Sequence, residues 1–178
     1  MVSSSRKAFG LVRAERAGVP ARALLRREHA DDAAYAAAVF GACREAGAEL
    51  VLLAGWLKLL RPIPADYRGK VLNIHPALLP AFGGAGFYGD RVHEAVLAHG
   101  CKLTGCTVHF VDDEYDAGPI VLQRAVPVLE DDDAHGLAAR VFEAEREAYP
   151  EAIRLYAAGR LRIEGRRVRV LPATPPRP

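Results

Sequence analysis

Continuous apolar runs alternate with amphipathic stretches along this chain, a pattern that predicts strands alternating with helices. Apolar runs bounded by turn residues at Glu49–Gly55 and Lys70–His75 indicate buried strands of a parallel sheet. Further strands are predicted at Val19–Leu25, Leu103–Val111 and Ile120–Val128. The pattern therefore predicts an α/β fold, with a Rossmann-like, mostly parallel sheet covered by helices on both faces.

Four stretches have helical patterns and recognisable ends. The predicted helices cover residues 6–17, Asp31–Ala46, Asp90–His99 and Asp133–Ala158. Asp31 suits the N-cap of its Ala-rich helix. Pro150 is expected to interrupt the last stretch by starting a second helix at its first turn.

The C-terminal part of the chain shows a different pattern. Leu161–Val170 alternates around Glu164-Gly165 and predicts a hairpin. Pro172–Pro178 holds four prolines and predicts disorder. We therefore expect one domain over residues 1–170 and a Pro-rich disordered tail over residues 171–178.

Composition narrows the class of protein. The chain has 178 residues, a formal net charge of +2 and scattered arginines, which disfavour a nucleic-acid-binding surface. It lacks an apolar stretch of the roughly 20 residues that a membrane span needs. The three cysteines, without paired spacing, disfavour a disulfide framework or a metal site and favour a reducing cytoplasm. Small-molecule substrates are the expected partners, for a monomer or a homodimer.

Candidate chemistry lies where the strand Lys70–His75 ends. Asn73 and His75 are two residues apart, so their side chains share one strand face, and Pro76 keeps the backbone extended. Asp116 follows forty residues later, in an Asp-Ala-Gly-Pro turn. An amide, an imidazole and a carboxylate can supply an oxyanion donor, a proton carrier and a group that tunes it. The simpler alternative is a capped loop end and an Asp that bonds its own turn.

Two loops allow more than one interpretation. Phe82–Gly89 has four glycines but lacks the dinucleotide-binding pattern, so a flexible loop beside a substrate is favoured. Trp56–Leu60 is explained by core packing, and it also suits the wall of a site for a flat heteroaromatic ligand.

The segments NIHPALLPAF, GCTVHFVDDEYDAGPIVLQ and the stretch from Val126 to Ile163 resemble the phosphoribosylglycinamide formyltransferase family of purine biosynthesis. The resemblance runs from Ser3 to about Ile163. It implies the formyltransferase fold and transfer of a formyl group from 10-formyltetrahydrofolate to the amine of glycinamide ribonucleotide, without a metal.

The resemblance also implies roles for particular residues. The family's catalytic Asn, His and Asp fall on Asn73, His75 and Asp116, and His109 matches a His near the site. Its folate-contacting residues fall on Leu57, Lys58, Leu59, Leu60, Asn73, Asp112, Asp113, Glu114, Tyr115 and Asp116. Its ribonucleotide-contacting residues fall on Phe142, Glu143, Ala144 and Glu145, with Glu145 as the expected acceptor for a ribose hydroxyl.

The chain also departs from the family pattern. Asp32 stands where some members have an Arg that contacts the folate. Nothing before Ser3 matches the family's first strand and phosphate-binding loop, so we expect an incomplete N-terminal βαβ portion and a natural start upstream of Met1. Two alternatives remain open: a formyltransferase acting on another amine, and a non-catalytic remnant that binds folate. If the enzyme is active, Asp116 is expected to raise the pKa of His75.

Overall fold

The computed structural model describes residues 1–173, which form two compact units, one over Met1–Val71 and the other from Leu72 onward. The predicted disordered tail over residues 171–178 thus lies largely outside the described residues. Each unit has its own buried core, and the candidate catalytic residues all belong to the second unit.

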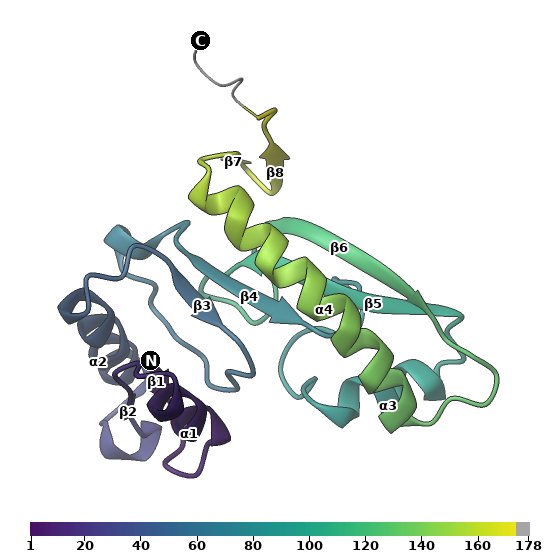
Figure 1. Ribbon diagram of the computed structural model, residues 1–178, viewed down its shortest axis with the longest axis horizontal. Helices are drawn as coiled ribbons and strands as arrows, with labels where there is room; N and C mark the ends of the chain where they lie inside the picture. Colours follow the sequence, from purple (N-terminus) through teal and green to yellow (C-terminus); the bar gives the residue numbers. More distant parts are fainter. Residues whose placement is uncertain (174–178) are drawn as a thin grey trace. The chain divides into compact units, whose positions relative to one another are not determined.

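The first unit combines short strands with helices (Figure 1). Its elements are β1 (Val2–Ser3), α1 (Phe9–Arg16), β2 (Arg22–Ala23), a 3₁₀ turn (Arg26–Glu28), α2 (Asp32–Glu45), β3 (Val51–Leu53) and a second 3₁₀ turn (Ala65–Tyr67). β1 and β2 pair in parallel. The predicted strand over Val19–Leu25 is only the two residues of β2. Before β2 the residues are exposed and Pro20 has no N–H to pair, and after it buried Leu25 leads into the 3₁₀ turn.

Helix α2 forms as its sequence predicts. The Asp31 carboxylate accepts a hydrogen bond from Ala34 N–H at 2.7 Å and caps the helix. Tyr35 and Phe40 project from it into the core and are fully buried. The Tyr35 hydroxyl donates to the Leu24 carbonyl at 3.1 Å, and the Phe40 ring lies 5.2 Å from the ring of Tyr67. Packing of these aromatic residues holds the first unit together.

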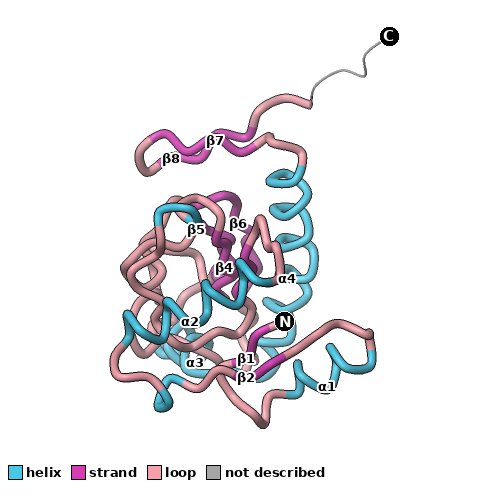
Figure 2. Tube along the Cα trace, turned by 90° about the vertical axis from the view of Figure 1, so that its left-hand side faces the viewer, coloured by secondary structure: helices cyan, strands magenta, loops and turns pink. Residues whose placement is uncertain are grey.

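The second unit is a mixed sheet with two helices (Figures 1 and 2). Its elements are β4 (Val71–His75, which begins at the last residue of the first unit), α3 (Asp90–Ala98), β5 (Leu103–Phe110), β6 (Ile120–Pro127), α4 (Ala134–Ala157), β7 (Leu161–Glu164) and β8 (Arg167–Val170). Its strands follow the order β4-β5-β6-β8-β7. β4–β5, β5–β6 and β7–β8 are antiparallel, whereas β6–β8 is parallel. The predicted α/β class and the predicted hairpin are confirmed.

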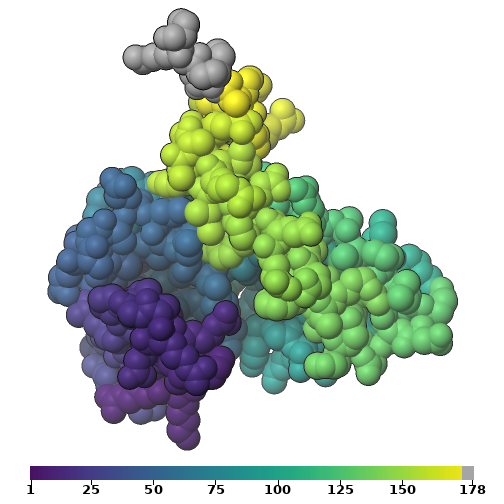
Figure 3. Space-filling model, in the orientation of Figure 1, coloured from purple at the N-terminus to yellow at the C-terminus, as the bar shows by residue number. Residues whose placement is uncertain are grey.

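Helix α4 packs across β5 and β6, and α3 packs beside α4. The apolar faces of these elements meet in a core with no exposed atoms or almost none, formed by Val92, Val96, Cys106, Val108, Leu137, Val141, Ala148 and Ala152. The outer side of α4 remains at the surface, as Figure 3 shows. The helix therefore braces the strands that carry the candidate site.

The predicted break at Pro150 is wrong, because α4 continues through this residue as one helix of 24 residues. A proline inside a helix removes one backbone hydrogen bond and crowds the preceding turn. Packing on both sides compensates here. Ala148 and Ala152 are fully buried, and the Tyr149 hydroxyl donates to the Leu72 carbonyl at 2.9 Å. Tertiary contacts therefore override the local signal.

Candidate active site

Strands β4 and β5 bring three polar side chains into the interior of the second unit. In their antiparallel register Asn73 lies opposite His109, and His75 lies opposite Thr107. Because side chains alternate along a strand, these positions project from the same face of the sheet. His75, Thr107 and His109 are all buried, with at most 4% of each residue exposed. Polar groups buried to this extent need partners, and each has one.

His109 fixes the orientation of Asn73. Its Nδ1 donates to the Phe110 carbonyl at 2.8 Å, because a carbonyl oxygen can only accept. The other ring nitrogen, Nε2, lies 3.2 Å from Nδ2 of Asn73 and accepts from the amide when the imidazole is neutral. One amide N–H of Asn73 is thereby used, and the second is directed at Oδ1 of Asp116, 3.5 Å away.

Asp116 joins these residues from the turn between β5 and β6. Its Oδ2 lies 3.5 Å from Nδ1 of His75, and its Oδ1 lies 3.5 Å from the Asn73 amide and 3.6 Å from Nε2 of His109. Two backbone features place it there. Asp116 is left-handed, with φ 51°, and a Cβ at Gly118 would lie 1.8 Å from the Phe110 carbonyl oxygen. Only glycine allows the turn to approach β5 so closely.

The Asp116 carboxylate is stabilised as an anion. Burial acts to raise its pKa, but the imidazoles of His109 and His75 and the Gly84 N–H lower it below the usual value. Gly84 N–H donates to Oδ2 at 3.0 Å. A carboxylate with these neighbours stays ionised at neutral pH. Its negative charge can therefore stabilise a proton on the neighbouring imidazole of His75.

The expected rise in the pKa of His75 is wrong. Burial lowers the pKa of this imidazole, and this effect outweighs the opposing influence of Asp116 and of the Phe82 carbonyl. Nε2 of His75 donates to that carbonyl at 2.8 Å. The sequence revealed the carboxylate but not how completely the fold removes His75 from water, and the desolvation of the charged form dominates.

A second network supports the loop that follows β4, and sequence reasoning missed it. The Thr107 hydroxyl donates to the Ala77 carbonyl at 2.6 Å and accepts from Leu79 N–H at 3.0 Å. The Gln123 amide lies 2.9 Å from the same hydroxyl and 3.0 Å from the Leu79 carbonyl. These residues belong to three separate segments, so no local pattern in the sequence marks them.

The predicted folate-contacting segments differ in exposure. In the second unit Asp112 is half-buried, and its carboxylate accepts from Glu114 N–H at 3.0 Å, whereas Tyr115 is 42% exposed. In the first unit Leu57 is exposed and Leu60 is buried in the core. The remaining residues of the two predicted segments are Lys58, Leu59, Asp113 and Glu114, all exposed except half-buried Leu59.

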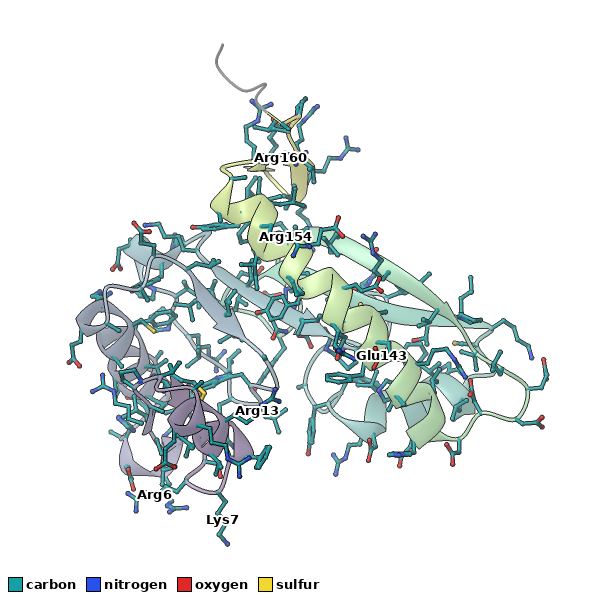
Figure 4. All side chains as sticks on the ribbon, viewed as in Figure 1. Arg6, Lys7, Arg13, Glu143, Arg154 and Arg160 are labelled. Atoms are coloured by element: carbon teal, nitrogen blue, oxygen red, sulfur yellow. The ribbon has the colours of Figure 1, made fainter. Side chains whose placement is uncertain are left out.

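The predicted ribonucleotide-contacting residues lie on α4 and fall into two kinds. Phe142 is 56% exposed, and Glu143, labelled on the outer side of α4 in Figure 4, forms an ion pair with Arg146 at 2.8 Å. Ala144 and Glu145 are half-buried. Burial raises the pKa of Glu145 to about 7, and this carboxyl has no ion-pair partner among the described residues. Glu145 is therefore the carboxyl of this segment that burial keeps protonated to a higher pH.

Residues 1–173 also bear on metal binding and on membrane insertion. No group of three or more His, Cys, Asp or Glu side chains there is arranged to hold a metal ion. None of the described helices combines the length and apolar character that crossing a bilayer requires.

The convergent amide, imidazole and carboxylate are suited to moving protons around a polarised carbonyl group. Comparison with known proteins agrees with this chemistry: residues 1–153 match the formyl transferase family, and the chain belongs to that family.

Named relatives narrow the comparison. The chain is 38% identical over 165 residues to phosphoribosylglycinamide formyltransferase of Haemophilus influenzae, an alignment that covers 92% of this chain and 76% of the relative. It superimposes with a TM-score of 0.90 on the crystal structure of glycinamide ribonucleotide transformylase 1 from Symbiobacterium toebii, at 46% identity, covering 96% of this chain and 79% of that one.

Some relatives are much longer. The chain is 42% identical to the trifunctional purine biosynthetic protein adenosine-3 of Gallus gallus over 92% of its own length, and it spans 16% of the length of that protein.

Proposed function

We propose that this protein transfers a formyl group from 10-formyltetrahydrofolate to the amine of glycinamide ribonucleotide in purine biosynthesis. One observation carries the proposal: the Asp116 carboxylate lies 3.5 Å from both Nδ1 of His75 and Nδ2 of Asn73, in a chain that belongs to the formyl transferase family. The names of its relatives, phosphoribosylglycinamide formyltransferase and glycinamide ribonucleotide transformylase, support this choice of substrate.

The proposed reaction exchanges one carbon–nitrogen bond for another. The amine nitrogen of the ribonucleotide forms a bond to the formyl carbon, and the bond between that carbon and N10 of the folate breaks. The amine loses a proton and N10 gains one, so no oxidant, reductant or metal is needed for balance. Negative charge develops on the formyl oxygen during the attack, and the protein must stabilise this charge and move the proton.

Each of the three residues has a role that its geometry permits. The Asn73 amide N–H that faces Asp116, across a long contact of 3.5 Å, donates to the formyl oxygen as charge develops there. His75 donates to the same region when protonated and accepts the amine proton when neutral. Asp116 stays ionised and stabilises the His75 cation. His109 holds the Asn73 amide in place through the 3.2 Å contact and has no direct role in the chemistry.

Substrate contacts follow from the family pattern and remain part of the proposal. Leu57 to Leu60, Asn73 and Asp112 to Asp116 contact the folate, and Phe142 to Glu145 contact the ribonucleotide. Glu145 supports this assignment best, because a half-buried carboxyl without an ion-pair partner is a ready acceptor for a ribose hydroxyl.

The test is an assay of the purified chain with 10-formyltetrahydrofolate and either glycinamide ribonucleotide or an amino sugar phosphate. We expect a formylated ribonucleotide by mass spectrometry and no product from the sugar. Formylation of the sugar alone would assign the chain to another amine. Tight folate binding without any formyl product would favour a non-catalytic protein.

The compartment and the oligomeric state of the protein are proposed as well. We propose a cytoplasmic enzyme that acts on small molecules as a monomer or a homodimer. The described residues contain free thiols at Cys43, Cys101 and Cys106, which agrees with a reducing compartment. Size-exclusion chromatography with light scattering distinguishes the monomer from the homodimer.

A further inference from the structure

The backbone of Phe82 bonds directly to the proposed catalytic histidine. We propose that Phe82 is a positioning residue: its carbonyl holds the His75 imidazole so that Nδ1, the nitrogen facing Asp116, is the one that exchanges protons. This inference rests on the proposed function and deepens it at the same site.

The hydrogen bond itself defines the tautomer. Nε2 of His75 lies 2.8 Å from the Phe82 carbonyl oxygen, and since that oxygen can only accept, Nε2 carries a hydrogen. Nδ1 is then the nitrogen that gains and loses a proton. It lies 3.5 Å from Oδ2 of Asp116, so protonation creates an N–H beside a carboxylate. The Phe82 carbonyl therefore selects the tautomer with hydrogen on Nε2, and this tautomer leaves Nδ1 as the reactive nitrogen of His75.

The carbonyl is held in this position by an unusual backbone conformation. Phe82 has φ 53°, a left-handed value that is unfavourable for a residue with a bulky side chain. Its ring is packed on two sides, with its centroid 6.2 Å from that of Phe87 and 5.3 Å from that of His99, both nearly perpendicular. Edge-to-face contacts of this kind stabilise the ring and so retain the strained backbone.

The two residues after Phe82, which are Gly83 and Gly84, contact the side chain of Asp116. A Cβ at Gly83 would lie 2.4 Å from Leu79 Cδ2 and 3.3 Å from Asp116 Cβ, so the backbone packs tightly against the Asp116 side chain. Gly84 N–H donates to Oδ2 of Asp116 at 3.0 Å. Residues 82–84 therefore contact both His75 and Asp116 and fix their separation.

The hydrogen bond from His75 to the Phe82 carbonyl also affects the pKa of His75. The Phe82 carbonyl acts to raise the pKa of His75, in the same direction as Asp116, whereas burial and His109 act to lower it. His93, whose own pKa is lowered by burial, is a further titratable group close to His75. Removing the carbonyl leaves burial less opposed and lowers the pKa of His75 further.

Imidazole nitrogen NMR on the whole, ligand-free chain tests the proposal without any turnover. We expect His75 to carry its hydrogen on Nε2 in the neutral state. In Phe82→Ala, which loses the ring contacts that retain the left-handed backbone, we expect both tautomers and a lower His75 pKa. Phe82→Gly, which permits positive φ, should lie between the two and remains informative if Phe82→Ala folds poorly. A neutral wild-type His75 with its hydrogen on Nδ1 would overturn the proposal.

Kinetics distinguish positioning from a purely structural role. We expect Phe82→Ala to lower kcat roughly tenfold, about the effect of one lost hydrogen bond, with little change in KM for either substrate. Phe9→Ala is the matched control, because Phe9 is an exposed phenylalanine at the start of α1, outside the proposed site. Equal kcat values and pH profiles for the two variants would contradict the proposal. An Nε2–H tautomer in a chain that does not formylate glycinamide ribonucleotide would support the positioning and contradict the proposed function instead.

Discussion

Two pairs of antiparallel strands in the second unit carry polar residues in opposite ways. In β4–β5 half-buried Asn73 faces buried His109, and the polar atoms of the two side chains contact each other. In β7–β8 the facing pair Arg162 and Arg169 lies at the surface, and both side chains form ion pairs with Glu164. Directly opposed residues of antiparallel strands therefore form a buried polar cluster in one place and a solvated charge cluster in the other.

The difference shows why burial, and not the presence of charged residues, identifies the site. Exposed ion pairs are weakened by water and salt and contribute little. Buried polar groups are costly unless satisfied, so a buried cluster that persists in a fold is held by many contacts. The two regions meet where Arg166 donates to the Ala117 carbonyl at 2.8 Å, next to Asp116. Substitutions on either side of that contact test the comparison.

The largest effect is expected for His75→Ala. Loss of the residue that carries the proton should lower kcat by about 10²–10⁴-fold, the usual contribution of general acid–base catalysis. Steady-state kinetics with glycinamide ribonucleotide measure the change. Arg169→Ala, in the exposed hairpin, is the control and should keep wild-type kcat. A His75→Ala enzyme with near-normal kcat would remove His75 from the mechanism.

The next effect is expected for Asn73→Ala. Removing one donor to a developing negative charge typically lowers kcat by about 10²–10³-fold, and KM should change little. Thr104→Val is a matched control, because Thr104 is buried in β5 and its hydroxyl has no hydrogen-bond partner among the described residues. Equal losses of kcat in both variants would show that Asn73 acts only through packing.

An intermediate effect concerns stability and pH at Glu145. Its folded-state pKa is raised to about 7, so folding favours the neutral carboxyl. This stability is fully present below the unfolded-state pKa and is lost as pH rises through about 7. The wild type should therefore lose on the order of 1–3 kcal/mol of its free energy of unfolding between pH 5 and pH 8 through this carboxyl. Glu145→Gln, which cannot ionise, should not show this loss.

Urea unfolding at the two pH values measures the Glu145 effect. Glu143→Gln is the matched control on the same helix, since Glu143 is exposed and paired with Arg146. The wild type and the Glu143 variant should lose the same stability with rising pH, and the Glu145 variant less. Three parallel pH profiles would contradict burial as the cause.

Local signals in the sequence were sufficient for some elements and not for others. The Asp31 cap and the strand that carries Asn73 and His75 were predictable, because each depends on residues that are neighbours in the chain. The continuous course of α4 through Pro150 was not, because packing of distant residues outweighs the local cost.

The site shows the same division. The spacing of Asn73 and His75 predicts a shared strand face, and Asp116 does contact both residues. The direction of the His75 pKa shift was predicted wrongly, since it depends on how completely the fold buries the ring. The Phe82 carbonyl was missed, because every residue has a carbonyl and only the left-handed turn directs this one at His75.

The smallest effect is expected for Glu164→Gln in the hairpin. Glu164 pairs with Arg162 at 2.7 Å and with Arg169, and all three side chains are at least 36% exposed. Water screens such pairs, so the free energy of unfolding should change by less than about 1 kcal/mol, and high salt should reduce the difference further. Urea unfolding at low and high salt measures both quantities. A salt-independent loss comparable to that of an interior substitution would show that the hairpin charges stabilise the second unit as strongly as the buried site, and the contrast between the two strand pairs would fail.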